Sequence, residues 1–329
     1  MFKSLVGLSL ILFAQLVLAN KKPDYLSITW ENDLFTLKDG GYTNGVSIAW
    51  AYEDLEYFTK DNTPPWLQTF TERLYISTMA NKQRAISYNV GQAMQTSSDL
   101  QQKTLAKNEA PYAGLALWRT VLYAYDETIA DRFSISVGFV GPVSTAKSTQ
   151  RFIHKVTGSE KPQGWSNQLK NEMVFQFSSE RLWLLTRQQS EFVSFDIIGI
   201  SSASLGTLSS GLASGISFRL GHNLQRTFAT SSLMPGREVN PLAGNADSAW
   251  SMFINIQGNF VANNILINGN TFEDSHSVPL KHWQTQLVTG ANFSLGRWAF
   301  MLSTAIRSKE YIGQPTHSRF GSLNITYNF

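Results

Sequence analysis

The sequence predicts an all-β protein, a twelve-stranded antiparallel transmembrane β-barrel of the bacterial outer membrane. Three observations support this prediction: an N-terminal secretion signal, segments in which apolar and small polar residues alternate, and a C-terminal phenylalanine, Phe329. After the signal, the sequence holds no segment apolar enough to be a spanning helix. Only helices and closed barrels satisfy every backbone hydrogen-bonding group in lipid, so a closed barrel is expected.

The first 19 residues have the organisation of a secretory signal peptide. Lys3 supplies the positive charge, residues 5–18 form a short apolar run, and Val17 and Ala19 occupy the −3 and −1 positions of a cleavage site. The alternative is an uncleaved anchor, but the apolar run is shorter than the roughly 18 to 20 residues that span a bilayer. We therefore expect a signal peptide at 1–19 and a barrel at 20–329.

Alternation of side chains locates the strands. In the segment 132–140, Phe133, Ile135, Val137 and Phe139 alternate with serines and a glycine, as in a barrel with an apolar outside and a polar lumen. The expected strands are 25–34, 43–53, 84–93, 112–125, 131–141, 170–180, 190–201, 207–222, 250–261, 284–294, 297–307 and 319–329. An even number of strands places both termini in the periplasm. The aromatic C-terminal strand is typical of barrels that are inserted by the barrel assembly machinery, which we expect as a partner during biogenesis.

Two of the connections assigned to the periplasm, 54–83 and 223–249, are longer than such turns usually are. Within the first, residues 66–75 favour a short helix after two prolines. The same parity places the loops 35–42, 94–111, 142–169, 202–206, 262–283 and 308–318 outside the cell. Any chemistry on the outer leaflet is expected in these loops.

Composition excludes several classes of site. The chain has no cysteine, which excludes disulfides and thiolate metal sites. Its net charge of +3 is too small to indicate a nucleic-acid partner. The candidate chemistry must therefore come from carboxylates, amides, hydroxyls and histidines.

The first expected strand ends in Glu31, Asn32 and Asp33, where the chain leaves the membrane. Carboxylate and amide oxygens suit a hard cation such as calcium. Thr43 begins the returning strand, so a hairpin would bring it beside Asp33. The alternatives are an ordinary polar rim and an ordinary hairpin turn.

A second group of candidates lies in the third outward loop. Residues 149–156 favour a helix whose Phe152, Ile153 and Val156 would form an apolar face against the barrel rim, and this helix would carry His154. Histidine is the usual general base near neutral pH. Glu160 follows six residues later. The remaining histidines at 222, 276, 282 and 317 receive no role.

Lys103 and Lys107 stand at the end of the second outward loop. They are candidates for contacts to phosphate groups, because an ammonium acts as a point charge for such anions. Solvated loop charges are the equally simple alternative.

Taken together, these segments resemble the lipid A 3′-O-deacylase family (LpxR-like). The resemblance is carried in order by residues 31–33 with Phe35, 42–45, 91–92, 111–114, 138–142, His154 with Gly158 and Glu160, 164–165, 168–169 and 171–172. It implies a calcium-dependent esterase that removes the 3′-linked acyloxyacyl group from lipid A in the outer leaflet. The substrate would be lipopolysaccharide. It would approach the site on the outward loops from the side, within the membrane.

The resemblance also implies the roles of the residues. His154 would activate water, and a calcium ion near Asp33 would stabilise the oxyanion of the ester carbonyl. Asn32 and Thr43 would position metal, water or substrate, and Glu160 would orient His154 or help bind the cation. One departure is Glu109-Ala110, where many relatives carry Asp-Arg, and we expect the missing arginine to weaken a phosphate contact or a buried pair.

Two other functions remain open from sequence. An outer-membrane phospholipase would use a Ser–His pair, but no serine here lies in a nucleophile motif. A non-enzymatic pore or adhesin would keep the scaffold with a degenerate site. Pores usually line the lumen with many charges, whereas charged residues make up 16% of this chain.

Overall fold

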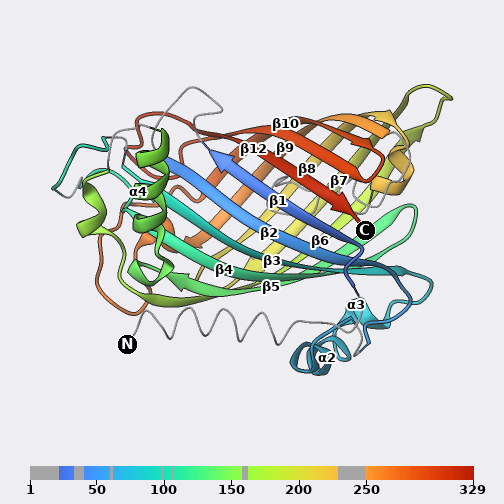
Figure 1. Cartoon of the computed structure of the whole chain (residues 1–329), viewed down its shortest axis with the longest axis horizontal. Coiled ribbons are helices and arrows are strands. Elements are labelled where there is room, and N and C mark those ends of the chain that lie inside the picture. The colour runs from blue at the N-terminus through green and yellow to red at the C-terminus, as the bar shows by residue number, and fades with distance from the viewer. Residues whose placement is uncertain are drawn as a thin grey trace.

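A computed structural model describes residues 22–32, 41–59, 62–97, 99–104, 107–157, 162–228 and 249–329. Twelve antiparallel strands close into one barrel, in which each strand pairs with its neighbours in sequence and β1 pairs with β12. Within these residues, no helix has the length and apolarity to cross a membrane. Figure 1 shows the short helices at the two ends of the barrel: α4 at one end, and α2 and α3 at the end that holds the C-terminus.

The prediction of the strands is confirmed, although several boundaries move. The strands are β1 (Tyr25–Asn32), β2 (Gly41–Leu55), β3 (Gln83–Thr96), β4 (Ala113–Tyr125), β5 (Ile129–Val140), β6 (Glu172–Gln188), β7 (Ser194–Leu205), β8 (Ser209–His222), β9 (Ala249–Asn264), β10 (Trp283–Leu295), β11 (Trp298–Arg307) and β12 (Ser318–Asn328). The helices are α2 (Pro65–Thr71), α3 (Tyr75–Thr78), α4 (Ala146–Thr157) and α5 (Ile265–Asn268), with 3-10 turns η2 (Pro142–Ser144), η3 (Gly164–Asn167) and η4 (Leu224–Thr227). The largest extension is β6, which continues eight residues beyond the expected 170–180.

The alternation of side chains works as the sequence indicates. On β1, Leu26, Ile28 and Trp30 are exposed on the outside of the barrel, and the residues between them are buried inside. The seam between the first and last strands is closed inside by hydroxyl and amide groups: Ser27 Oγ lies 2.5 Å from Thr326 Oγ1, and Asn324 Nδ2 donates to Thr29 Oγ1 at 2.8 Å. A slip of the strand register by one residue would exchange the two faces of the sheet. The observed register therefore keeps the outer surface apolar and the inner surface polar.

The described part of the second long connection turns into the lumen at the end that holds the C-terminus. Phe228 packs against Leu182, Ile198 and Ile200 on the inner wall. Arg219, also on the inner wall, donates to the carbonyls of Leu224 and Thr227 and makes two hydrogen bonds to Asp196. This part of the connection fills the lumen instead of extending away from the barrel.

A second segment fills the opposite mouth of the barrel. Ile265 of α5 packs against Leu115, Val140 and Val174 on the inner wall. Gln95 Nε2 donates to the carbonyl of Leu266 at 2.8 Å, which fixes α5 to the wall. Between the two filled ends lies a lumen cavity of about 430 Å³, lined mainly by serine, glutamine, asparagine and arginine side chains.

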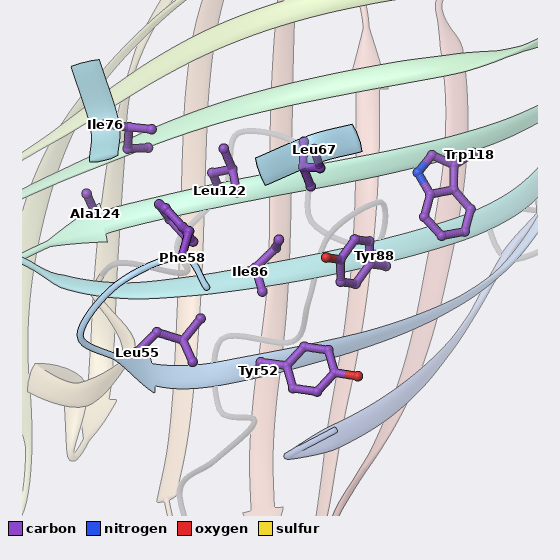
Figure 2. Packing of buried hydrophobic residues seen from close by; sticks show 10 residues of the cluster. All are labelled: Tyr52, Leu55, Phe58, Leu67, Ile76, Ile86, Tyr88, Trp118, Leu122 and Ala124. Carbon is purple, nitrogen blue, oxygen red and sulfur yellow. The ribbon is translucent and has the colours of Figure 1, made fainter. Parts of the chain in front are cut away.

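The first long connection lies outside the barrel. The expected short helix is present as α2, followed by α3, and both pack on the outer wall of β2, β3 and β4. Figure 2 shows Leu67 of α2 and Ile76 of α3 above Ile86, Tyr88 and Leu122 of the wall. We call the described residues of the segment 55–82 the periplasmic cap, since they lie at the end of the barrel that holds the C-terminus, which the sequence analysis assigns to the periplasm.

Candidate active site

Helix α4 lies against the outside of the barrel, at the end where β1 finishes (Figure 1). Its N-terminal end is seated on β3 and β4 through Gly114, where a Cβ would lie 2.2 Å from Ser144 Oγ and 2.5 Å from Ala146 Cβ. Gln92 on β3 donates to the carbonyl of Ser144 at 2.5 Å. The close approach therefore requires glycine at 114 and fixes the start of the helix on the wall.

The turn that leads into α4 is also built on a glycine. Gly141 has φ +99°, a conformation that glycine adopts without strain, and its N–H donates to Gly114 O at 2.8 Å. The side chain of Asn171 accepts a hydrogen bond from Val143 N at 2.7 Å. The chain thus leaves β5, turns through η2 and returns along the outer wall.

Trp165 from η3 holds the helix from its other side. It packs with Met94, Tyr112 and Ala146, and its Nε1 donates to Gln150 Oε1 at 2.7 Å. Burial raises the pKa of Tyr112, against a smaller opposite effect of the Ser97 hydroxyl, so this phenol packs as a neutral ring. The helix is therefore clamped between the barrel wall and the loop that follows it.

The prediction of the helix is confirmed, but the prediction that Phe152 packs against the barrel is wrong; the side chain of Val156 lies outside the described residues. Phe152 is 68% exposed, while Ala146 and Gln150 are buried. The seat is built from Gly114 and from the side chains of Gln92 and Met94 on the wall, so a small residue and an amide fit it better than a phenylalanine. Phe152 instead faces away from the wall.

Two asparagines on the outer wall lie at the same end of the barrel. Asn32 follows Trp30 on the outward side of β1, and Asn44 is its direct cross-strand partner on β2. Both occupy lipid-facing positions, yet Asn32 is only 6% exposed and Asn44 only 4%. Asn44 Oδ1 is buried without a hydrogen-bond partner among the described residues. A buried amide oxygen of this kind is available for a cation or for a donor group of a ligand.

The predicted site residues are only partly described. The backbone of Thr43 lies at a register shift between Tyr42 and Asn44, a β-bulge of the kind that re-aims side chains beside active sites. Asp33 and Glu160 lie outside the described residues. Among the described residues, no group of three or more histidine or acidic side chains is placed to hold a metal.

His154 lies one helical turn after Gln150, so both side chains project from the same face of α4. Gln150 is buried and its Nε2 has no hydrogen-bond partner among the described residues. The helix contacts β3, and Asn44 pairs with Met94 of β3. His154 and the Asn32–Asn44 pair therefore belong to one outer face at one end of the barrel.

Sequence reasoning assigned no role to two residues of this region. The available signal for Gln150 was its position four residues before His154 on a helix. Trp165 had no local signal, because its contacts come from segments distant in sequence. His276, to which no role was given, donates from Nε2 to the carbonyl of Glu109 at 2.8 Å and so braces the second outward loop.

The two candidate phosphate-binding lysines, Lys103 and Lys107, are exposed in that loop. The carbonyl of Lys103 accepts a hydrogen bond from Asn167 Nδ2 at 2.9 Å, which ties the loop to η3. The loop thus lies next to the segment that holds α4. Nothing in the geometry prefers one lysine over the other.

Comparison with known proteins then decides the family. The model of the family described as "Outer membrane protein LpxR" matches residues 5–329. The chain belongs to the LpxR family of outer-membrane proteins. No curated protein matches it.

The solved structure of one family member agrees with this assignment at the level of fold, and two other outer-membrane barrels are only distantly similar. LpxR from Salmonella typhimurium is 15% identical, with a TM-score of 0.78 over 93% of this chain and 100% of that chain. The β domain of the Bordetella autotransporter BrkA, 7% identical over 93% and 98%, reaches a TM-score of 0.46. The KdgM porin, 6% identical over 93% and 99%, reaches 0.38. The chain is therefore an outer-membrane barrel of the LpxR type.

Proposed function

We propose that this LpxR-family chain is a calcium-dependent hydrolase that removes the 3′-O-linked acyloxyacyl group from lipid A. The observation that carries the proposal is the buried Asn32–Asn44 pair on the lipid-facing wall, at the end where α4 carries His154. Polar groups at lipid-facing positions are costly unless they are used or paired. A site on the outside of the barrel suits a substrate that resides in the membrane.

The outer wall beside the two asparagines, toward the middle of the membrane, offers a lipid substrate a lateral approach to them. Trp30, Val46 and Ile48 are exposed on the outward sides of β1 and β2, next in line after Asn32 and Asn44. An acyl chain lying along these residues would bring its ester to the level of the amides. Because lipopolysaccharide occupies the outer leaflet, lipid A is the lipid with ester groups at this depth.

The donor set fits a calcium ion. Calcium prefers oxygen ligands, and the region supplies the unpaired Asn44 Oδ1 and the amide of Asn32. Two carboxylates complete the proposed set: Asp33, next to Asn32 in sequence, and Glu160, six residues after His154. When bound, the ion would stabilise the negative charge that develops on the ester oxygen. Thr43 at the bulge would position the water or the substrate.

In this proposal, His154 acts as the general base. It accepts a proton from water as the water oxygen attacks the ester carbonyl carbon. As the bond to the 3′ oxygen breaks, the proton returns to that oxygen, which leaves as the sugar hydroxyl. Glu160 orients His154 or contributes to the cation site, and Lys103 or Lys107 meets the lipid A phosphates.

The test is the mass spectrum of lipid A from cells with and without the protein. The proposal expects loss of the mass of one acyloxyacyl group when the protein is produced. Unchanged lipid A, with the folded barrel detected in the outer membrane, would contradict it. Conversion of phospholipid to lysophospholipid instead would indicate a phospholipase.

Removal of calcium gives a second test, on purified protein with purified lipid A. Deacylation is expected to stop in excess chelator and to return when calcium is restored, because no other group of the proposed site can neutralise the oxyanion. Heat-modifiable migration on gels serves as the control that the barrel remains folded. Full activity in excess chelator would refute the role of the metal.

A further inference from the structure

The periplasmic cap, residues 55–82, covers a part of the barrel that would otherwise face lipid. Register places Ile86 and Tyr88 of β3 opposite Tyr52 and Trp50 of β2, on the outward face of the sheet. Yet Tyr88 and Ile86 are fully buried, together with Leu67 and Ile76 of the cap (Figure 2). The cap therefore replaces lipid on this sector of the wall.

The contrast with the other side of the barrel is large. On β9, Met252 is 57% exposed and Ile254 is 47% exposed on the outward face. On the described residues of β3 and β4, no large apolar side chain is exposed. The outward face of the barrel is thus covered on β3 and β4 and bare on strands such as β9.

The cap is fixed to the wall by directed hydrogen bonds. Arg84, buried on the outward face of β3, donates to the carbonyls of Glu56, Ser77, Met79 and Lys82. Tyr88 OH donates to the carbonyl of Asn62 at 3.0 Å. These contacts satisfy backbone carbonyls that would be unpaired in a dry environment, as an element in lipid requires.

The depth of the covered stretch matches one leaflet. On β4 it runs from Trp118 to Ala124, six residue steps, with Ala124 next to the last residue of the strand. At about 3.3 Å per residue and a tilt of about 40°, these steps rise about 15 Å, about half the hydrocarbon thickness of a bilayer. The cap thus stands beside the barrel at the level of the periplasmic leaflet.

The outer surface of the cap is aromatic. Tyr57 is 60% exposed and Phe70 is 58% exposed, and Phe70 is followed closely by the exposed Glu72 and Arg73. Aromatic and charged residues side by side are typical of elements that lie in a membrane interface. A purely periplasmic element would have no reason to expose such aromatics.

We propose that the periplasmic cap is a membrane-embedded element that binds the phospholipids of the periplasmic leaflet, with Phe70 and Tyr57 among the acyl chains. The barrel then presents its bare outer wall to lipid on β1, on the part of β2 that carries Val46 and Ile48, and on the strands away from the cap. Beneath α4, lipid of the periplasmic leaflet meets the cap and not the strands.

The test uses the absence of cysteine, since each introduced cysteine is the only one in the chain. A nitroxide is attached to Phe70→Cys in vesicles of phosphatidylethanolamine and phosphatidylglycerol, and its accessibility to oxygen and to an aqueous nickel complex is measured. Ile254→Cys on the bare wall is the lipid control, and Glu127→Cys in the exposed β4–β5 turn is the water control. Tyr57→Cys is a second probe should the first variant fail to fold.

The proposal expects an oxygen-to-nickel ratio at position 70 severalfold above that of position 127 and similar to that of position 254. A ratio equal to that of position 127 would overturn it, because the cap would then lie in water. Low accessibility to both reagents, with an immobilised label, would also overturn it, because a second protein would then cover the cap. None of these readouts depends on deacylase activity.

Discussion

At the scale of the residue, the most informative feature is an amide oxygen that the fold leaves unpaired. Asn44 Oδ1 is buried on the outer wall without a partner among the described residues. A buried unpaired acceptor costs about 1–3 kcal/mol, and replacing it with an apolar group of similar shape removes this cost. Stability alone would therefore favour leucine at this position.

This conflict gives a prediction for Asn44→Leu. We expect the melting temperature to stay the same or rise, while deacylation falls about 10- to 100-fold, since a lost contact to a charged group is worth about 1.5–3 kcal/mol. Asn44→Asp keeps the oxygen and is the matched control, with activity closer to the wild type. A large loss of stability in Asn44→Leu, without any specific loss of activity, would show that the amide has only a structural role.

His154 allows a second prediction at this scale. His154→Gln keeps a polar side chain of similar length but removes the base, so we expect turnover to fall by about 10²- to 10⁴-fold. Calcium-dependent protection against thermal unfolding should persist, because the histidine is not proposed as a ligand. A His282→Gln variant, changed at a histidine of the β9–β10 connection, should retain full activity. Equal activity of the two variants would remove the proposed base.

How far sequence predicts the site differs from residue to residue. The acidic end of the first strand and the helix with His154 are visible because they are local patterns. The pairing of Asn32 with Asn44 follows from the hairpin register of β1 and β2, and the register shift at Thr43 lies between β2 and β3. Gln150 is held by Trp165, and Gly114 seats the start of the helix that carries it. Because these residues come from separate segments of the chain, no local sequence pattern predicts the burial of Gln150.

At the scale of the element, α4 depends on the surface on which it is seated. The wall under its first turn is formed by Gly114, and an added Cβ would overlap Ser144 and Ala146. We expect Gly114→Ala to displace the helix, at a cost of about 1–3 kcal/mol for overpacking, and to lower activity by about tenfold or more. Gly258→Ala on β9 is the matched control, because nothing lies within 4 Å of its Cβ.

Two properties of the Gly114→Ala and Gly258→Ala variants are measured: the rate of deacylation and the protease sensitivity of the loop that contains α4. Displacement should make the 142–169 loop of Gly114→Ala more susceptible to cleavage, while barrel assembly is unchanged. If both alanine variants retained full activity, the seat of α4 on the wall would not matter for the reaction.

Among the elements, the sequence predicts strands better than the segments between them. Strand alternation has a period of two and is set by the membrane outside and the polar lumen inside, so all twelve strands are found. The helix of the first long connection was predicted, but the surfaces on which the two connections pack were not, because these contacts depend on how several strands are arranged in space. The apolar residues of the connections cover the outer wall in one case and fill the lumen in the other.

At the scale of the whole molecule, the proposed function makes the barrel a scaffold that works on its outer surface. The inner wall carries ion pairs, such as Arg132 Nη1 with Glu180 Oε1 at 2.7 Å. Phe253, Met301 and Phe320 form an apolar cluster across the inner faces of β9, β11 and β12. Side chains and inserted segments thus occupy much of the interior, unlike the water-filled channel of a porin.

This filling gives a prediction that separates the enzyme from a pore. In planar bilayers, the purified protein is expected to show no stable conductance steps, because η4 with Phe228 fills one end of the lumen and α5 fills the other. The variant R219M removes the hydrogen bonds that hold Leu224 and Thr227, so transient openings are expected in that variant only. Steady ohmic steps in the wild type, of the size that an open twelve-stranded barrel would give, would favour the pore and count against a scaffold that works on its outer surface.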